Sequence, residues 1–460
     1  MTDVLTIPRF AGEVLLPGDA QYDAHREVWN AAVDRRPAMI ARCTSADDVA
    51  SAIRHGRDRG LEIAVKCGGH SVMGLSVPDG GLMLDLTPMS SVVIDPMQRR
   101  ALVQGGSLLR NLDRATEPHG LATTAGNVSH TGVGGLTLGG GMGWLARQFG
   151  LASDNVAAYT LVASDGQVVR ASADEHPDLF WGLRGGGGNF GVVTEFEFRL
   201  HPTSGRVLVA ELTYDAADAV GPMRTWRDML PDAPRAAMLT ADGVAIPADS
   251  PSKLAGRPAV IVGFVWSGAV DEGRAYLETF RSALPNPSAE EVDERTYVEL
   301  QSLFDDRHRH GLRRYSTGHY LPALPDDAID AFLSRGIPTG APEPDWSLMP
   351  GSGFQAYGGA IADLDDGDSA FSFRDTLVEW TTGATWSDPA EDEVRMGNAR
   401  RWARALDPWG TGAYVNVIGD AGEVRRAYRD AKFEKLVELK RAWDPENVFH
   451  LNHNIRPDAA

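Results

Sequence analysis

The sequence predicts an α+β protein of two domains, and three observations support this. The chain has 460 residues, too many for one ordinary core. Its first half mixes short strand and helix patterns with dense glycine clusters. From about residue 206 glycine becomes rarer, whereas proline and acidic residues become more frequent. We expect a first domain over residues 1–205, a second over 206–411, and a segment over 412–460 that returns to the first.

The first domain begins with a clear helix pattern over residues 45–60. Ser45 and Asp48 have the spacing of a capping box, and Gly60 ends the pattern. The other elements expected in this half are strands over 62–66, 82–86, 157–164, 167–170 and 192–200, and a helix over 107–117. The strand over 192–200 is the clearest, because apolar and charged residues alternate along it.

The second domain differs from the first in composition, but we expect it to contain both strands and helices as well. We expect strands over 207–213 and 259–265, and helices over 270–283 and 326–335. The tail carries a long helix pattern, roughly 421–442, which Asp444 and Pro445 end.

Charge and composition exclude several classes of function. A formal net charge of -19 argues against a nucleic-acid or anionic-membrane partner, since both require a positive surface. No apolar run reaches membrane-spanning length, and the opening MTDVLTIPRF lacks the features of a secretory signal. Cys43 and Cys67 are the only cysteines, which excludes a disulfide scaffold or a cysteine-built metal cluster. We expect a cytosolic protein, monomeric or homodimeric, that acts on a small molecule.

Three glycine clusters carry most of the functional signal. They cover residues 66–71 (with Gly74 close behind), 132–143 and 184–191. Successive glycines leave backbone N–H groups free to point at one anion, which suits a diphosphate. For one cluster alone, turns in a glycine-rich protein would be the better explanation. Three clusters with a histidine in the first favour ligand contact. A nicotinamide-binding βαβ unit is the weaker alternative, because no acidic residue stands in the required downstream position.

These clusters, with several shorter motifs, resemble the berberine-bridge-enzyme-like branch of the vanillyl-alcohol-oxidase fold. The additional motifs are Asp154-Asn155, Asp178-Leu179-Phe180-Trp181 and Asp444-Pro445-Glu446-Asn447-Val448-Phe449 followed by Asn452 and Asn454. The resemblance covers nearly the whole chain, most strongly residues 35–203 and 412–456. It implies a PCMH-type two-part FAD-binding domain and an α+β substrate domain with an antiparallel sheet.

The resemblance also implies a covalent flavin. His70 matches the histidine that attaches to the flavin 8α carbon, and a turn histidine with one hydrogen bond is the alternative. The family's second link is a cysteine whose place here falls at Val128, so the attachment should be single. Cys67 is expected to be packed rather than reactive. The residues expected to bind the cofactor are Lys66, Cys67, Gly68, Gly69, His70, Ser71, Gly74, Gly126, Ser129, Gly132, Val133, Gly135, Leu136, Gly140, Gly143, Gly191, Val192, Asn452 and Asn454.

The chemistry expected at the flavin is hydride acceptance at N5 with dioxygen (O2) as electron acceptor. Val133 matches a position that influences oxygen entry in relatives. Many relatives carry a deprotonating tyrosine in a Tyr-x-Asn-Tyr segment, but here Val417 replaces the second tyrosine after Tyr414 and Asn416. Another base must then serve, or the reaction needs none.

His130 and Thr131 are the candidate substitutes. Ser129-His130-Thr131-Gly132 resembles a bacterial subgroup in which oxygen is activated at flavin N5. An imidazole and a hydroxyl beside N5 could bind oxygen or exchange a proton. The alternative is that His130 orders its loop by hydrogen bonding to backbone, and the sequence leaves both open.

Residues of the second domain are candidates to line the substrate cavity: Tyr320, Tyr357, Glu379, Trp380 and Trp386. Glu379 is expected to be the buried acid among them. The basic run Arg307–His310 with Arg313 and Arg314 favours a solvated face over an anionic-substrate site. The pairs His308/His310 and His450/His453 are expected to be structural, and we expect no metal.

Three functions therefore stay open at the level of sequence. The first is an FAD oxidase acting on an alcohol or amine carbon. The second is an oxygenating enzyme of a polyketide or similar pathway. The third is a non-enzymatic flavin-binding protein.

Overall fold

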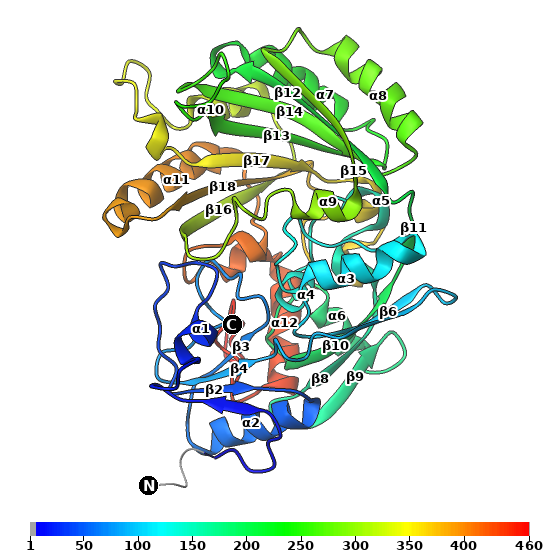
Figure 1. Ribbon diagram of the computed structural model, residues 1–460, viewed down its shortest axis with the longest axis vertical. Helices are drawn as coiled ribbons and strands as arrows, with labels where there is room; N and C mark the ends of the chain where they lie inside the picture. The colour runs from blue at the N-terminus through cyan, green and yellow to red at the C-terminus, as the bar shows by residue number, and fades with distance from the viewer. Residues whose placement is uncertain (1–5, 460) are drawn as a thin grey trace.

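The computed structural model of the protein describes residues 6–459. One large sheet occupies the upper half of the molecule, and the smaller sheets occupy the lower half (Figure 1). Residues 1–5 and residue 460 lie outside the described residues. Residues 1–5 are the start of the N-terminal stretch in which we expected no secretory signal. Seven strands form the upper sheet, and sheets of four, five and two strands lie below it. The expected α+β class is confirmed.

The lower half begins with a four-stranded sheet in the order β1-β2-β4-β3. Its strands are β1 (Glu13–Leu15), β2 (Met39–Arg42), β3 (Ile63–Lys66) and β4 (Leu82–Asp85), of which β2, β4 and β3 run parallel. Helix α2 (Ala46–Asp58) connects β2 to β3, and the short α1 (Tyr22–Arg26) precedes β2. The Ser45 hydroxyl caps α2 as expected, but Asp48 does not complete a capping box. Its carboxylate instead accepts from Thr44 and from Ala11, which ties the N-terminal segment to the helix.

A five-stranded antiparallel sheet follows in the order β5-β6-β10-β8-β9. Its strands are β5 (Val92–Asp95), β6 (Arg100–Gln104), β8 (Val156–Val162), β9 (Val168–Ser172) and β10 (Val192–Arg199). Phe196 and Phe198 of the alternating strand are buried, which confirms the expected inward face. The helices and the two-stranded sheet of this half are α3 (Leu109–Thr116), α4 (Val133–Leu138), α5 (Ala146–Phe149), α6 (Pro177–Leu183), β7 (Leu121–Ala122) and β11 (His201–Pro202).

The upper sheet is antiparallel throughout, in the order β15-β12-β14-β13-β17-β18-β16. Its strands are β12 (Arg206–Asp215), β13 (Ala237–Ala245), β14 (Pro258–Trp266), β15 (Ala289–Thr296), β16 (Arg313–Leu321), β17 (Gly351–Ala356) and β18 (Val378–Trp386). The helices of this half are α7 (Val220–Met229), α8 (Val270–Ala283), α9 (Tyr297–Ser302), α10 (Asp326–Ser334) and α11 (Asp392–Leu406).

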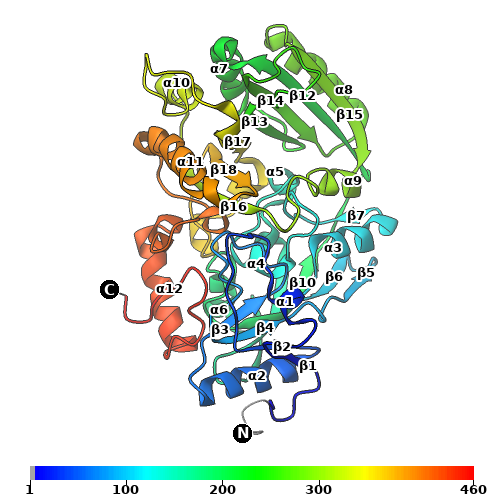
Figure 2. The ribbon, with the colours of Figure 1, turned by 60° about the vertical axis from the view of Figure 1, so that its left-hand side comes forward.

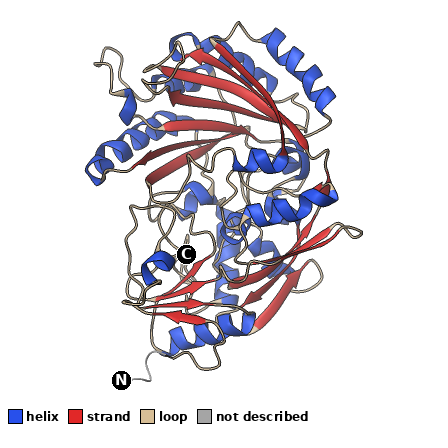
Figure 3. Ribbon diagram, viewed as in Figure 1, coloured by secondary structure: helices blue, strands red, loops and turns tan. Residues whose placement is uncertain are grey.

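The two faces of the upper sheet contact different parts of the molecule. One face carries Leu239, Phe264 and Trp380, which pack against buried side chains of α7, α8, α10 and α11 such as Trp226 and Trp402. Figure 3 shows these helices on the outer side of the sheet. Because side chains alternate along a strand, the residues in between face the lower half.

The tail returns to the lower half through α12 (Asp430–Trp443), which lies beside α6 in Figure 2. Phe433, Leu436 and Ile455 join the same apolar core as the five-stranded sheet. The expected start of this helix near residue 421 is wrong. Gly422 has φ +83°, and residues 424–427 form a separate 3-10 turn, so the helix begins only after Arg429. The other expected elements lie within two residues of those observed.

The division of the chain after residues 205 and 411 stays our proposal. Within the described part of the chain, no helix is both long enough and apolar enough to cross a membrane.

A buried ion pair fixes the tail. Lys440 and Asp444 are both fully buried, with Nζ 2.7 Å from Oδ2. The same ammonium donates to the carbonyls of Asn189 and Phe449, and the Asp444 carboxylate accepts from the N–H groups of Val448 and Phe449. The pair thus joins α12, the third glycine cluster and the final segment.

We predict that Lys440→Met lowers the free energy of unfolding by about 3–5 kcal/mol, because it leaves the Asp444 carboxylate buried without its cation. Calorimetric melting of the variant measures this. Lys435→Met removes an exposed lysine from the same helix and is the matched control. Equal melting temperatures for the two variants would contradict the role of the pair.

Candidate active site

A cavity of about 1090 Å³ lies between the two halves of the molecule. Its wall includes residues of all three glycine clusters, the inward face of the upper sheet and the final segment of the chain. The sequence-predicted residues that line it are Cys67, Gly68, Gly69, His70, Ser71, Thr131, Gly132, Gly135, Leu136, Gly191, Val192, Glu379, Tyr414, Asn416 and Asn452.

The first cluster forms an open loop with unpaired backbone donors. Among the described residues, the N–H groups of 69–72 have no hydrogen-bond partner, although all four residues line the cavity. Gly69 has φ +67°, a conformation that favours glycine. Lys66 lies behind the loop, where its ammonium donates to the carbonyls of His25 and Glu27. The loop therefore offers a row of N–H groups suited to an anion.

The second cluster packs directly on the first. A Cβ on Gly132 would lie 2.4 Å from the Gly68 nitrogen and 2.6 Å from the Cys67 sulfur. Gly139 similarly gives room to Asn416, whose Oδ1 would lie 2.3 Å from an added Cβ. Close backbone approach, rather than turn formation alone, explains these glycines.

Several predicted cofactor residues support the cavity from behind rather than line it: Lys66, Gly74, Gly126, Ser129, Val133, Gly140, Gly143 and Asn454. Val133 is fully buried in the core of the lower half. Gly143 allows contact with the Ala125 carbonyl, which would lie 1.7 Å from a Cβ.

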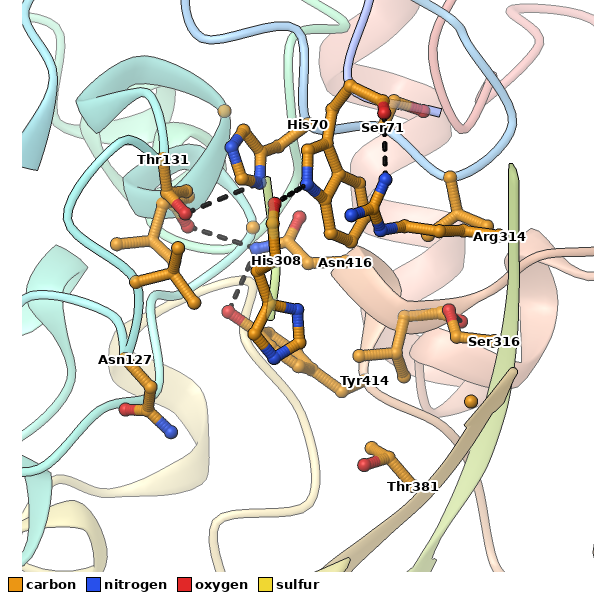
Figure 4. A pocket seen from close by; sticks show the side chains of 18 of the residues that line it. His70, Ser71, Asn127, Thr131, His308, Arg314, Ser316, Thr381, Tyr414 and Asn416 are labelled. Atoms are coloured by element: carbon orange, nitrogen blue, oxygen red, sulfur yellow. Dashed lines mark hydrogen bonds between the residues drawn. The ribbon is translucent and has the colours of Figure 1, made fainter. Parts of the chain in front are cut away.

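His70 is held at one end of the cavity by three neighbours. Its ring stacks on Trp29, with centroids 4.6 Å apart and planes 14° apart. Its Nε2 lies 2.8 Å from Nδ1 of His130, and its Nδ1 lies 3.4 Å from the Thr131 hydroxyl. Figure 4 shows His70 and Thr131 facing each other, with Tyr414 and Asn416 beyond them. Burial, then the neighbouring His130 and His310, hold the pKa of His70 well below its usual value, so the imidazole is neutral at neutral pH.

His130 is positioned by a contact from the upper half. The Asp305 carboxylate accepts from the Ser129 N–H (3.0 Å) and hydroxyl (2.6 Å), which fixes the loop. Burial lowers the pKa of His130, and Asp305 opposes this in part. Two neutral imidazoles 2.8 Å apart share one proton, and one ring must donate while the other accepts.

His310 joins these two rings, which the sequence did not predict. Ligand nitrogens of His70, His130 and His310 lie within 4.8 Å of one another. The short separation of His70 from His130 is that of a hydrogen bond, so we treat the group as an imidazole cluster rather than a metal centre. Burial lowers the pKa of His310 to about 4.

The basic run is the solvated face that we expected at Arg307, Arg309 and His310, which are exposed, but not at Arg314. Arg314 is only 4 % exposed, and its guanidinium donates to the carbonyls of Trp29, Leu312 and Arg309. It also lies over the Trp29 ring, 4.0 Å from the centroid. The Trp29 indole donates to the His308 carbonyl at 2.5 Å. These contacts support the ring that stacks on His70.

Tyr414 stabilises the second glycine cluster. Its hydroxyl accepts from the N–H groups of Gly141 (3.0 Å) and Met142 (3.2 Å) and from the Asn416 amide (2.8 Å). Burial, with the nearby Glu379, raises the pKa of Tyr414 to about 12. The three donors around the oxygen lower this pKa in part, but a phenol with a pKa of about 12 stays protonated near neutral pH and is poorly suited to act as a base.

Glu379 is the buried acid expected on β18, and it faces the cavity. It accepts a hydrogen bond from the Tyr357 hydroxyl at 3.0 Å. Burial raises the pKa of Glu379 to about 7, although the Tyr357 hydrogen bond lowers it in part. A carboxyl group with this pKa can exchange a proton near neutral pH.

The other four cavity candidates do not line the wall. Trp380 packs under the outer helices and Trp386 in a small core against α11. Tyr320 and Tyr357 lie in an apolar cluster between the halves. The alternation of β18 explains this for Trp380, which points away from Glu379. Residues of the wall that the sequence did not predict include Trp29, Asn127, Glu211, Asp242, Arg314 and Thr381.

Comparisons with known proteins agree with this architecture. The family model described as FAD binding domain matches residues 37–172, and that described as berberine and berberine like matches 413–456. (R)-6-hydroxynicotine oxidase of Paenarthrobacter nicotinovorans is 31% identical, over 98% of this chain and 97% of its own length. The structure of the BBE-like 1 protein of Physcomitrella patens has a TM-score of 0.85 and 25% identity, over 97% of each chain. Glucooligosaccharide oxidase from Acremonium strictum, described with a 6-S-cysteinyl, 8α-N1-histidyl FAD, has a TM-score of 0.83 and 25% identity over 98% of each chain.

We predict that Tyr414→Phe lowers the melting temperature and leaves the pH dependence of activity unchanged. The change leaves three donors without their acceptor, at about 1–3 kcal/mol for each buried unpaired group. Tyr428→Phe, which removes a single hydrogen bond to the Gly185 carbonyl, is the control and should melt at a higher temperature than Tyr414→Phe. If Tyr414→Phe melts like the wild type but no longer reduces its flavin, the hydroxyl is the proton acceptor instead.

Proposed function

The chain belongs to the berberine-bridge-enzyme-like family of FAD-linked oxidases, and from this membership we propose that it holds FAD covalently through His70 alone and oxidises an alcohol or amine carbon of a small organic molecule. Hydride transfer goes to flavin N5, and dioxygen is the electron acceptor. Relatives named as oxidases of a hydroxynicotine and of glucooligosaccharides support the two substrate types. The relatives are enzymes, so the non-enzymatic alternative is set aside.

The arrangement around His70 is the observation that carries the proposal. FAD, when bound, would supply a hydride acceptor at N5 and an 8α-methyl carbon that can bond to a nucleophile: the methyl group would lose a proton, the flavin ring would take up two electrons, and dioxygen would then remove them. The unpaired N–H groups of residues 69–72 fit its diphosphate, and the cavity is large enough to hold a flavin together with a small substrate. A neutral imidazole is the nucleophilic form that such a bond requires.

The contacts of His70 favour Nδ1 as the bonding atom. Its Nε2 is engaged with His130 at 2.8 Å, whereas Nδ1 has only the long 3.4 Å contact with Thr131. If Nε2 carries the proton, Nδ1 holds a free electron pair. When Nδ1 forms its bond, the Nε2 proton would pass to His130 Nδ1, so the positive charge would move from His70 to His130, where Asp305 opposes the effect of burial in part. The relative described as N1-histidyl supports the same choice.

A second link is not supported by either cysteine. Val128 occupies the place of the family's second attachment. Burial raises the pKa of Cys67 to about 11, and its thiol donates to the Ser107 carbonyl. Both cysteines are free thiols, which is consistent with the cytosolic location that we propose.

Glu379 is our candidate for the proton acceptor in substrate oxidation. It is the cavity acid next to Tyr357, and Tyr414 is held protonated by its surroundings. Asn416 donates to the Leu136 carbonyl as well as to Tyr414, which joins the tail to the second cluster. His130 is less suited to N5, because C8α and N5 lie on opposite sides of the benzenoid ring of a flavin. No observation therefore favours the oxygenating alternative, which incorporation of labelled oxygen into product would reveal.

We predict that the wild-type protein keeps its flavin after acid precipitation and that His70→Ala releases it. Mass spectrometry of digested wild-type protein should detect one flavin-bearing peptide, around His70. A second flavin-bearing peptide at Cys67 or Cys43, or freely extractable wild-type flavin, would refute the single histidyl link.

We also predict that His130→Ala slows covalent attachment by roughly 10²–10⁴-fold, since a positioned proton acceptor contributes about that much to a step. Incubation of the apoprotein with FAD, followed by gel fluorescence over time, gives the rate. His450→Ala, at an outer histidine bonded to Glu62, is the matched control. Unchanged attachment together with altered reoxidation by oxygen would move His130 to the oxygen chemistry instead.

A further inference from the structure

The inward face of the upper sheet carries three carboxyl groups that the sequence did not group together. Strand pairing places Glu211, Gly263, Thr240, Gln355 and Glu379 in one row across β12, β14, β13, β17 and β18. Asp242 lies two residues along β13 from Thr240, opposite Gly353 and Ile261. Since residues two apart share a face, Asp242, Glu211 and Glu379 all face the cavity, and all three line it.

Two of these carboxyl groups lack any protein partner. Among the described residues, the side chain of neither Asp242 nor Glu211 takes part in a hydrogen bond or an ion pair. Glycines beside them keep the space open, because a Cβ on Gly353 would lie 2.4 Å from Asp242 Oδ1, and Gly263 separates Glu211 from Thr240. Both residues are half-buried, and a carboxylate that is partly removed from water without a cation is costly, so this corner of the cavity fits a ligand that supplies a positive charge.

The charges around this corner do not neutralise it. Burial, then Glu211, raises the pKa of Asp242 to about 7, and Arg307 lowers it in part. Burial and Glu291 raise the pKa of Glu211, and Arg295 opposes them. Arg307 comes from the exposed loop before β16.

The other two arginines of the cavity wall have partners elsewhere. Arg314 donates to backbone carbonyls, and Arg395 binds Glu391 and the Ser347 carbonyl. They therefore leave the exposed Arg307 as the arginine of the described cavity wall that acts on Asp242, and it forms no ion pair with Asp242 or Glu211.

The wall next to the carboxyl corner is apolar. Trp144, Val209, Val265, Leu300 and Phe304 all line the cavity. Val209 and Val265 lie on the same strands and the same face as Glu211 and Gly263, two residues away. An occupant that suits both surfaces has an apolar body and a basic nitrogen.

We propose that Asp242 and Glu211 form a subsite for the cationic nitrogen of a basic amine substrate, whose apolar part lies against Trp144, Val209 and Val265. The proposal rests on the proposed oxidase function and adds the substrate class. Glu379, farther along the same row, stays available for proton transfer at the carbon that is oxidised. The amine is bound as its ammonium form, with N–H groups donating to the two carboxylates.

Equilibrium binding to the flavin-loaded protein tests this without turnover. The probes are 4-phenylbutylamine and 4-phenylbutan-1-ol, which have the same apolar body and differ in the charged end. At pH 8 we expect the amine to bind about 10- to 100-fold more tightly by flavin difference absorbance, as expected for a hydrogen-bonded charge. Asp242→Asn and Glu211→Gln should each remove most of that preference and leave the affinity for the alcohol unchanged. Asp271→Asn on α8 removes one negative charge from an exposed position and should change nothing.

The pH dependence gives a test that needs no variant. Because Asp242 ionises around pH 7 and the amine stays protonated, amine binding should tighten between pH 6 and 8, whereas alcohol binding should not change. Equal affinities for the two probes, or a preference that both variants retain, would overturn the subsite. A flavin-loaded protein without amine preference leaves the oxidase proposal intact, whereas a protein that takes up no flavin refutes that proposal. If the protein takes up no flavin, isothermal titration calorimetry measures binding of the two probes instead.

Discussion

The close packing of two glycine loops is the constraint on which the site depends. Gly68 and Gly132 approach so closely that a Cβ on either would lie 2.4 Å from the backbone nitrogen of the other. No side chain fits between them. Their contact brings residue 70 and residue 130 together from loops that are 60 residues apart in sequence, and the 2.8 Å contact of the two imidazoles follows from it. The same approach places His130 beside His70, where it adds to the effect of burial in keeping the His70 imidazole neutral.

The strands of the upper sheet form both a core, on one face, and a wall of the cavity, on the other. Alternation along each strand assigns every second residue to the core under the outer helices and the others to the cavity. Trp380 and Glu379 are neighbours in sequence, yet one packs under the helices and the other faces the cavity. Polar and charged side chains can therefore gather in one row without disturbing the core behind them.

This organisation also explains how much the sequence could predict. Local patterns were sufficient for α2 with its Ser45 cap, for the alternating β10 and for the glycine clusters, since each is specified by residues close together in the chain. The start of α12 was missed because the turn after Gly422 interrupts an otherwise helical composition. The carboxyl row could not be predicted, because it depends on the register of five strands that are far apart in sequence. The burial of Arg314 was missed for a related reason: nothing near it in the sequence indicates that its guanidinium lies over Trp29.

The loop before β16 contacts both the surroundings of His70 and the carboxyl corner of the cavity. Asp305 binds Ser129, the His308 carbonyl accepts from Trp29, and Arg314, at the start of β16 itself, lies over the same indole. A segment from the upper half thus orders both supports of His70, although His70 itself belongs to the lower half. The same segment contributes Arg307 to the cavity wall near Asp242. Since one short loop contacts the histidine that we assign to the flavin and the corner that we assign to the substrate, displacement of the loop would disturb both sites. The three residues that hold His70 therefore belong to the lower half, whereas contacts that order two of them, Trp29 and His130, come from the upper half.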